Sequence, residues 1–295
     1  MSRLKSIKWL TFILIFISSI TFISCSNKEK TKEKTTEPKT QEETKSLEKT
    51  KTETPEVEIV LEKETYNIMV GTTEETEVYV FRSNIDGPTV FITGGTHGDE
   101  LAGWHAALKL LDRTDYRGTV IIIPRLDKMG TKLEQRYPGI NNGGIHDGIQ
   151  YSNLNRVFPG NEHGNVTEQL AYAITQELDK YAPDYVIDLH ESRSSYSTET
   201  GSLLGDQLLY ANARSALLCE DLVDIYNKTK AAPGDVPFGF DGPGVAGSLN
   251  NYYGTVLGVL GFTVETNRKL DLSKRIAQQL DIVDVFFNYI WFGDE

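Results

Sequence analysis

Two segments, far apart in the sequence, carry histidines and carboxylates with spacings that suit a metal ion. In the first, residues 94–100 (GGTHGDE), His97 and Glu100 stand three positions apart at a predicted strand-to-helix turn. At this spacing an imidazole and a carboxylate can face one point, as a tetrahedral or five-coordinate Zn²⁺ site requires. In the second, residues 188–190 (DLH), His190 follows an apolar strand and is placed as a third ligand. Each segment alone is a weak signal, because a solvated loop histidine or a histidine satisfied in the core gives the same pattern.

Two further carboxylates could act beside such an ion. Glu265 closes the strand-like run GFTVE, where a carboxylate is costly unless it has a partner or a task. Next to a zinc-bound water it would serve as general base and then as proton donor to the leaving amine. The structural alternative is a salt bridge to Arg268 or Lys269. Asp188 precedes His190 by two residues on the same strand face, from which it could orient the imidazole.

Residues 153–160 (NLNRVFPG) combine amide side chains with an arginine in front of a turn. Arginine binds carboxylates through two parallel hydrogen bonds. Arg156 together with Asn155 could therefore hold a carboxylate of the substrate. The alternative is that the arginine only ties down a long loop rich in Gly, Asn and Tyr, which we expect over residues 126–165.

A layered α/β sheet must position these segments. Short apolar runs alternate with runs of helical periodicity, which is typical of a sheet covered by helices on both faces. In such sheets ligand groups gather at the carboxyl ends of the strands, where His97, His190 and Glu265 are predicted to lie. We expect strands at 57–70, 77–83, 89–93, 118–123, 185–189 and 261–265, the first two at an edge, and helices at 100–112, 167–181, 207–227, 247–258 and 272–290.

The first 57 residues are predicted to be a signal peptide followed by a disordered linker. Residues 1–25 contain three basic and no acidic side chains, with an apolar run of about 15 residues that suits a signal peptide better than a bilayer-spanning helix. The run ends in FISC, which resembles the lipobox of bacterial lipoproteins and makes Cys25 the expected site of lipidation. An uncleaved membrane anchor is the alternative. Residues 26–57 hold eight Lys and eight Glu and almost no large apolar side chain, so we expect a disordered linker.

The remaining part, residues 58–295, is expected to be one folded domain in the cell envelope, lipid-anchored on the outer side of the cytoplasmic membrane or in the periplasm or outer membrane. It carries 19 basic and 34 acidic side chains. An acidic surface argues against nucleic acid as a partner, because phosphate binding needs a basic face. Cys25 and Cys219 are the chain's two cysteines, which excludes a disulfide framework.

The order H-x-x-E, N-R-x-F-P-G, D-L-H and T-V-E resembles the zinc carboxypeptidase superfamily, in particular its succinylglutamate desuccinylase/aspartoacylase branch with the related small predicted deacylases. The resemblance covers roughly residues 88–290. It implies a three-layer α/β/α sandwich with a mixed, mostly parallel central sheet. It also implies one Zn²⁺ per chain, held by the residues matching His97, Glu100 and His190, and a catalytic role for Glu265.

The resemblance further implies that Asn155 and Arg156 bind the carboxylate of the substrate. Members of the family usually have an aspartate at the position of Asn153, where it accepts a hydrogen bond from the first zinc-binding histidine. The amide of Asn153 can accept the same bond but carries no charge, so we expect a somewhat lower affinity for zinc.

Two residues complete the predicted site. The family usually has a second arginine that polarises the scissile carbonyl, and among Lys128, Lys132 and Arg136 we assign this role to Arg136. Tyr253 could contact the substrate, as a tyrosine does in carboxypeptidases, or pack in the core or at the rim of the site.

The expected activity is zinc-dependent hydrolysis of an amide bond next to a carboxylate-bearing amino acid, by a deacylase anchored to the membrane through an N-terminal lipid. Two alternatives stay open. One is a metallocarboxypeptidase that acts on peptides, including cell-wall stem peptides with a free carboxylate. The other is a non-catalytic lipoprotein that binds a metal or a ligand, although binding alone would have no need of Glu265.

Overall fold

The computed structural model describes residues 58–193 and 205–293. The predicted signal peptide, the predicted lipidation site Cys25 and the predicted linker lie outside these ranges. Within them, no helix is both long and apolar enough to span a bilayer.

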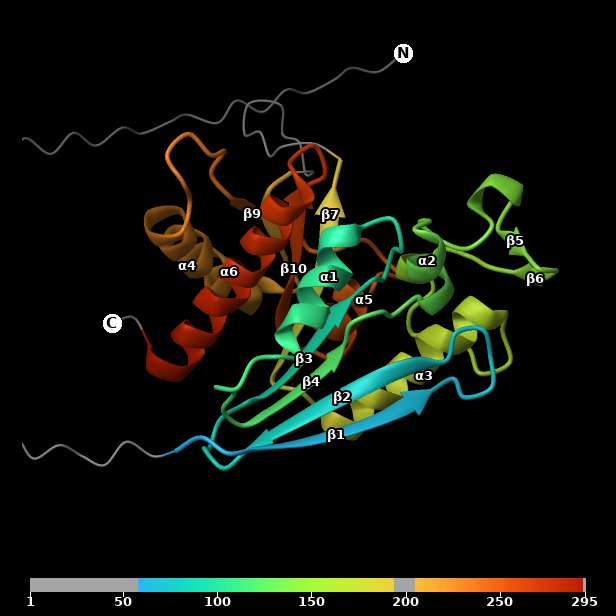
Figure 1. Cartoon of the computed structure of the whole chain (residues 1–295), viewed down its shortest axis with the longest axis horizontal. Helices are drawn as coiled ribbons and strands as arrows, with labels where there is room; N and C mark the ends of the chain where they lie inside the picture. The colour runs from blue at the N-terminus through green and yellow to red at the C-terminus, as the bar shows by residue number, and fades with distance from the viewer. Residues whose placement is uncertain (1–57, 194–204, 294–295) are drawn as a thin grey trace, which may run out of the picture. The chain divides into compact units, whose positions relative to one another are not determined.

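Eight strands form one mixed sheet with a parallel centre (Figure 1). They are β1 (Leu61–Ile68), β2 (Thr76–Ser83), β3 (Thr89–Gly94), β4 (Thr119–Ile123), β7 (Tyr185–Ser192), β8 (Gln207–Tyr210), β9 (Gly239–Asp241) and β10 (Leu260–Asn267). Their order across the sheet is β1-β2-β4-β3-β7-β10-β8-β9. The four central strands β4, β3, β7 and β10 run parallel, whereas β1 with β2, β2 with β4, and β8 with β10 pair antiparallel.

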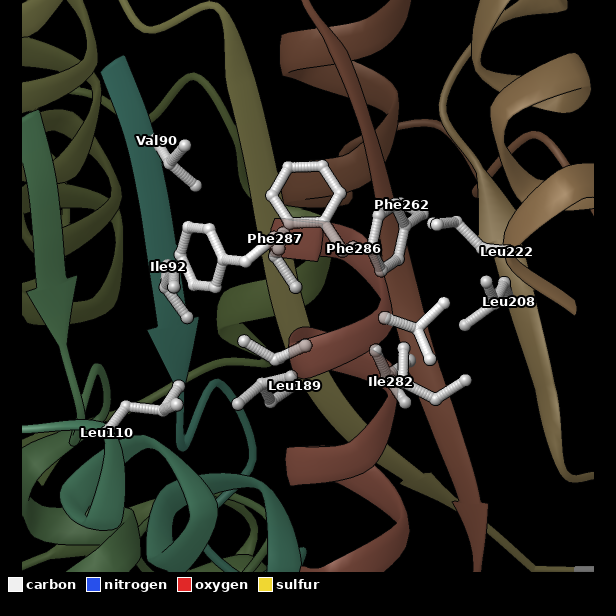
Figure 2. Packing of buried hydrophobic residues seen from close by; sticks show 14 of the residues in the cluster. Val90, Ile92, Leu110, Leu189, Leu208, Leu222, Phe262, Ile282, Phe286 and Phe287 are labelled. Atoms are coloured by element: carbon white, nitrogen blue, oxygen red, sulfur yellow. The ribbon is translucent and has the colours of Figure 1, made fainter. Parts of the chain in front are cut away.

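Helices cover both faces of this sheet and make three layers (Figure 1). Side chains such as Ile92, Leu189 and Phe262 point to one face, where they pack against α6 and its neighbours (Figure 2). Phe91 and Val186 point to the other face, into a second core with α3. The first core lies beneath α1 (Leu101–Leu110), α4 (Ala213–Thr229) and α6 (Leu272–Phe292), and the second beneath α3 (Val166–Tyr181) and α5 (Leu249–Asn251). The predicted three-layer sandwich is confirmed.

The alternation of side chains along β7 aims its polar residues at a single face. Ile187 and Leu189 lie in the core beneath α1 and α6. Asp188 and His190 must therefore point to the opposite face, because neighbouring side chains of a strand alternate. In the parallel pairing of β7 with β10, Glu265 stands beside His190. The two strands thus bring an imidazole and a carboxylate together near their carboxyl ends.

The segment 126–165, predicted as a long loop, contains several short elements. These are α2 (Lys128–Leu133), the hairpin strands β5 (Ile145–His146) and β6 (Ile149–Gln150), and the 3₁₀ turns η1 (Ile140–Asn142) and η2 (Leu154–Arg156). Elements of two to six residues are too short to give a readable periodicity. The helix α2 begins after Asp127, whose carboxylate accepts a hydrogen bond from the backbone N–H of Gly130 at 2.6 Å.

The prediction of one helix over 207–227 was wrong in its first part. Residues 207–210 form β8, which pairs with β10, and α4 begins after Asn212, whose side chain caps the helix by accepting from the N–H groups of Arg214 and Ser215. The prediction that residues 77–83 form an edge strand was also wrong, because β2 lies between β1 and β4. The helix predicted at 247–258 is present as α5 followed by a π-helical turn, η3 (Tyr252–Val256).

Candidate metal and substrate site

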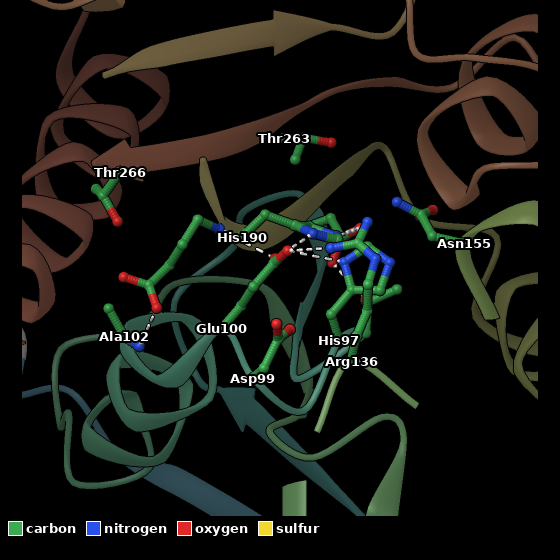
Figure 3. A network of polar contacts seen from close by, with 12 residues as sticks. His97, Asp99, Glu100, Ala102, Arg136, Asn155, His190, Thr263 and Thr266 are labelled. Atoms are coloured by element: carbon green, nitrogen blue, oxygen red, sulfur yellow. Dashed lines mark hydrogen bonds and ion pairs between the residues drawn. The ribbon is translucent and has the colours of Figure 1, made fainter. Parts of the chain in front are cut away.

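Three side chains from two strand ends converge on one point (Figure 3). His97 lies in the turn after β3, Glu100 at the first residue before α1, and His190 in β7. Nδ1 of His97 is 2.9 Å from Oε1 of Glu100, and Nδ1 of His190 is 2.7 Å from Oε2 of the same carboxylate. The potential ligand atoms of all three residues lie within 4.8 Å of one another, and all three are buried. Two imidazoles and a carboxylate in this arrangement can hold a divalent metal ion.

The electrostatics of this group are set by opposite charges at short range. Burial by itself would raise the pKa of Glu100, but the charges of His97 and His190 hold it well below its ordinary value. Burial would lower the pKa of His190, but Asp188 and Glu100 raise it well above its ordinary value. The carboxylate and the imidazole therefore stabilise each other's charge, and the site is built to hold positive charge between them.

The second nitrogen of each imidazole is fixed by an outer partner. Nε2 of His97 lies 3.0 Å from Oδ1 of Asn153, and Nε2 of His190 lies 2.7 Å from Oδ2 of Asp188. Asp188 is held in turn by the hydroxyl groups of Thr93 and Thr96, which donate to Oδ1 at 2.8 and 3.0 Å. These contacts direct Nδ1 of both rings at Glu100, which is the orientation that a metal ligand needs.

Glu265 lies beside this group without belonging to it. Its carboxyl group faces the same cavity as His97, Glu100 and His190. Burial, followed by the negative charges of Glu100 and Asp188, raises the pKa of Glu265 to about 8, although His190 opposes the shift. Among the described residues Glu265 forms no ion pair, whereas Arg268, its predicted alternative partner, bonds to Asp99. A carboxyl group with a raised pKa and no fixed partner is suited to proton transfer.

Two arginines face the cavity close to the metal-ligand group. Nη1 of Arg136 donates to Oε1 of Glu100 at 3.2 Å. Arg156, in η2, is exposed, and partial desolvation together with the positive charge of Arg136 lowers its pKa. Asn155 also lines the cavity, and its Oδ1 accepts a hydrogen bond from the N–H of Leu249 at 3.0 Å. The two guanidinium groups concentrate positive charge that a carboxylate ligand would neutralise.

The cavity has a volume of about 630 Å³. It opens over the carboxyl ends of β7 and β10, at the position that the strand pattern predicted. Its walls come from the metal-ligand turn, η2, the end of β7, and the segment from β9 to α5. The lining residues are His97, Glu100, Arg136, Asn153, Asn155, Arg156, His190, Glu191, Ser192, Arg193, Leu209, Asp241, Gly242, Pro243, Gly244, Val245, Ser248, Asn250, Thr263 and Glu265.

Tyr253 does not reach this cavity. Its side chain has no exposed surface and packs in the core on the α3 side of the sheet. The side chain of Asn250, which does line the cavity, donates to the Tyr253 hydroxyl at 3.3 Å. Of the two interpretations of Tyr253, the structure supports packing in the core. Asn250 lies between Tyr253 and the cavity, so the Tyr253 side chain is not in position to contact a substrate.

The sequence did not single out Asp241 or Arg193 as lining residues. Asp241 ends the three-residue strand β9 inside a Gly/Pro-rich stretch, and Arg193 follows directly after β7. Its position three residues after His190, close to the carboxyl end of the strand, is a signal that could have pointed to Arg193. No sequence signal would have found Asp241, because β9 joins the sheet only through β8, itself missed.

A family model and one curated relative match this chain. The model described as the succinylglutamate desuccinylase/aspartoacylase catalytic domain matches residues 86–284. The N-alpha-acetyl-L-2,4-diaminobutyric acid deacetylase of Halomonas elongata is 39% identical over 108 residues, which are 36% of this chain and 29% of that protein.

Solved structures share the fold at low sequence identity. Tripeptide-bound Csd4, a cell shape determinant of Helicobacter pylori, gives a TM-score of 0.60 at 15% identity and covers 78% of this chain and 55% of that one. A succinylglutamate desuccinylase from Silicibacter gives a TM-score of 0.54 at 21% identity and covers 73% and 60%. This chain spans less than two thirds of the length of each of these relatives. On the family match, which includes every residue of the metal-ligand group, the chain belongs to the succinylglutamate desuccinylase/aspartoacylase catalytic domain family.

Proposed function

We propose that the protein is a zinc-dependent hydrolase that cleaves an amide bond next to a carboxylate-bearing amino acid. The observation that carries the proposal is the presence, in one cavity, of a metal-ligand group, an unpaired carboxyl group at Glu265, and the guanidinium groups of Arg136 and Arg156. Each component has a task in amide hydrolysis, and a binding site alone would not need them all.

The donor set fits Zn²⁺. Two imidazole nitrogens and a carboxylate oxygen are the ligands of many catalytic zinc sites, which keep a further position open. His97, Glu100 and His190 would hold the ion, with Asn153 and Asp188 orienting the two rings. When bound, Zn²⁺ lowers the pKa of a coordinated water toward 7 and polarises a carbonyl.

The protein's own residues supply the proton transfers and the charge stabilisation. Glu265 takes a proton from the attacking water and delivers it to the leaving nitrogen, because its carboxyl group faces the cavity beside His190. Arg136, next to Glu100, is placed to stabilise the oxyanion. Arg156, together with Asn155, binds the carboxylate of the amino acid that leaves.

The size of the cavity favours a second candidate within the same chemistry. A volume of about 630 Å³ would admit the end of a peptide as well as an acyl amino acid. Among the structural relatives, Csd4 is described as a D,L-carboxypeptidase. A metallocarboxypeptidase acting on peptides, including cell-wall stem peptides, would use the same residues.

We also propose that the enzyme is a lipoprotein of the cell envelope, anchored through Cys25 and held away from the membrane by residues 26–57. The support is the apolar run followed by FISC and a spacer of balanced charge. Metabolic labelling with a palmitate analogue, compared between the wild type and Cys25→Ser, would test the anchor. Equal labelling of the two proteins would contradict it.

The activity is tested by incubating the zinc-loaded protein with N-acyl amino acids and with peptides that have free C-termini, each with and without a chelator. Chelator-sensitive release from acyl amino acids would support the deacylase, and release of C-terminal residues would support the carboxypeptidase. If zinc is bound and neither panel is cleaved, the proposal fails for these two substrate classes and the alternative of a non-catalytic metal- or ligand-binding protein is favoured.

A further inference from the structure

One wall of the cavity carries a negative charge that the proposed reaction does not use. Asp241 ends β9 and stands beside Leu209 of β8 in the parallel register, and both residues line the cavity. Oδ1 of Asp241 accepts a hydrogen bond from the N–H of Gly242 at 2.7 Å. Among the described residues the carboxylate has no cationic partner, although it is half-buried.

Each of the other carboxylates that line the cavity has a bonded partner or a task in the proposed reaction. Glu100 is bonded to both histidines, and Glu191 forms an ion pair with Arg275 while it accepts the N–H of Ala102. Glu265 has no ion-pair partner among the described residues, but the proposed reaction uses its carboxyl group for proton transfer. Asp241 is therefore the negative group of this wall that is left for a ligand.

The segment between Asp241 and α5 connects this carboxylate to the wall that carries Arg156. The carbonyl of Gly247 accepts the N–H of Phe158 at 3.0 Å, and the N–H of Gly244 donates to Oδ1 of Asn250 at 2.9 Å. Gly247 lies so close to Arg156 that an added Cβ would come within 2.3 Å of the Arg156 carbonyl oxygen. These contacts hold the segment that follows Asp241 against the wall that carries Arg156, and both residues line the same cavity.

We propose that Asp241 binds a positively charged group on the amino acid that the enzyme releases. The preferred substrates would then be N-acylated diamino acids, or peptides that end in one, with their carboxylate at Arg156 and their side-chain ammonium at Asp241. This inference rests on the proposed hydrolase function. It names the substrate class from the charges of the cavity, since a half-buried carboxylate without a partner favours a cationic ligand and disfavours an anionic one.

Matched substrates test the proposal. Nα-acetyl-lysine and Nα-acetyl-norleucine differ in the ammonium group, and so do the peptides Ala-Lys and Ala-norleucine. We expect the wild type to hydrolyse the cationic member of the preferred pair with a kcat/KM at least about 10-fold higher, the effect of one charge-assisted bond. The acetylated pair and the peptide pair distinguish a free small molecule from a peptide end.

Asp241→Asn keeps an acceptor for Gly242 and removes the charge. We expect it to lower kcat/KM for the cationic substrate by about 10- to 100-fold and to leave the norleucine substrate within about 2-fold. Asp241→Lys should reverse the preference toward Nα-acetyl-glutamate. Glu220→Gln, which removes an exposed carboxylate on α4, is the matched control and should change neither rate. Equal rates of the wild type on both members of each pair, or an equal loss for both in Asp241→Asn, would overturn the proposal.

Calorimetric binding of free lysine and norleucine to the wild type and to Asp241→Asn separates this inference from the proposed function. If no amide is cleaved but lysine binds more tightly than norleucine and loses that advantage in Asp241→Asn, the hydrolase assignment fails and the cation site stands. If amides are cleaved and binding shows no such difference, the cation site fails and the hydrolase assignment stands.

Discussion

Two buried groups of ionisable side chains in this protein compensate their charge in opposite ways. In the metal-ligand group, Glu100 lies between two imidazoles, whose charges hold its pKa well below the ordinary value despite burial. Glu74 and Asp127 form the second group, in which two buried carboxyl groups lie close enough to shift each other's pKa. There, burial raises the pKa of Glu74 to about 7, and burial and the charge of Glu74 raise the pKa of Asp127 well above its ordinary value.

The difference shows which cation each group is built for. A carboxylate between imidazoles can exchange protons for a metal ion without leaving an unpaired charge. A pair of carboxyl groups without a base between them is satisfied by one shared proton. Glu74 also accepts the N–H of Met129 and Asp127 that of Gly130, so the two carboxyl groups together fix the start of α2.

The two groups are linked through a close approach of backbone. A Cβ added at Gly98, next to His97, would lie 1.9 Å from the carbonyl carbon of Gly130 in α2. The acid pair therefore supports the turn that carries His97. Substitutions in the two groups should separate metal binding from structural support.

The largest effect is expected from Glu100→Gln. An amide between His97 and His190 offers one neutral oxygen, so we expect the affinity for Zn²⁺ to fall by at least about 1000-fold, more than the loss of an outer partner of a ligand causes. Competition with a zinc-binding dye measures it. Glu74→Gln is the matched control, because the acid pair should bind no zinc. An equal loss of affinity in the two variants would erase the distinction between the groups.

Glu265→Gln should remove catalysis and leave the metal. Glu265 stands beside His190 in the sheet but outside the group of three ligands. We expect the variant to keep its zinc and to lose at least about 100-fold in kcat, the size of a general-base effect. Metal analysis and turnover on the same sample check both parts. Unchanged turnover would take Glu265 out of the mechanism, and loss of zinc would make it a ligand.

Glu74→Gln should change how stability depends on pH. The pKa of Glu74 is raised from 4.5 to about 7 in the folded protein, so its proton stabilises the fold fully below pH 4.5, and this contribution is lost as the pH rises to about 7. The amide does not ionise. Between pH 5 and 8 the variant should therefore lose less free energy of unfolding than the wild type, by about 2–3 kcal/mol.

Urea denaturation at pH 5, 6.5 and 8 measures this difference. Glu75→Gln is the control, because hydrogen bonds from Gly71 and Asn67 lower the pKa of Glu75, so that it loses its proton at a lower pH than Glu74 does. Parallel stability curves for the wild type and Glu74→Gln would show that the two acids do not share a proton.

The sequence predicted the metal-ligand group much better than the acid pair, for a physical reason. His97, His190 and Glu265 lie at or near the carboxyl ends of strands, and parallel strands bring those ends to one edge of the sheet whatever the detailed packing. Glu74 and Asp127 meet because the turn before β2 packs against the start of α2, an element too short to be read from periodicity.

The same limit explains the other differences. The strand β8 exists because residues 207–210 pair with β10, more than fifty residues away, and local pattern cannot show that pairing. Tyr253 follows a short helix whose π-helical continuation turns its ring into the core. Asp241 enters the cavity through β9, whose place depends on β8. The prediction of these elements and residues failed because it could not include pairing between segments far apart in the sequence.

The smallest effect is expected from Asn153→Asp. Oδ1 of Asn153 faces Nε2 of His97 and also accepts the N–H of Asn155 at 3.0 Å. A carboxylate would keep both bonds and add a charge beside a ligand imidazole, so we expect zinc affinity to rise by up to about 10-fold. Asn161→Asp, in the loop that follows η2, is the control. An unchanged affinity would mean that the orientation of the His97 ring, which the amide already provides, matters more for zinc binding than a charge at residue 153. The corresponding partner of His190 is already a carboxyl group, that of Asp188.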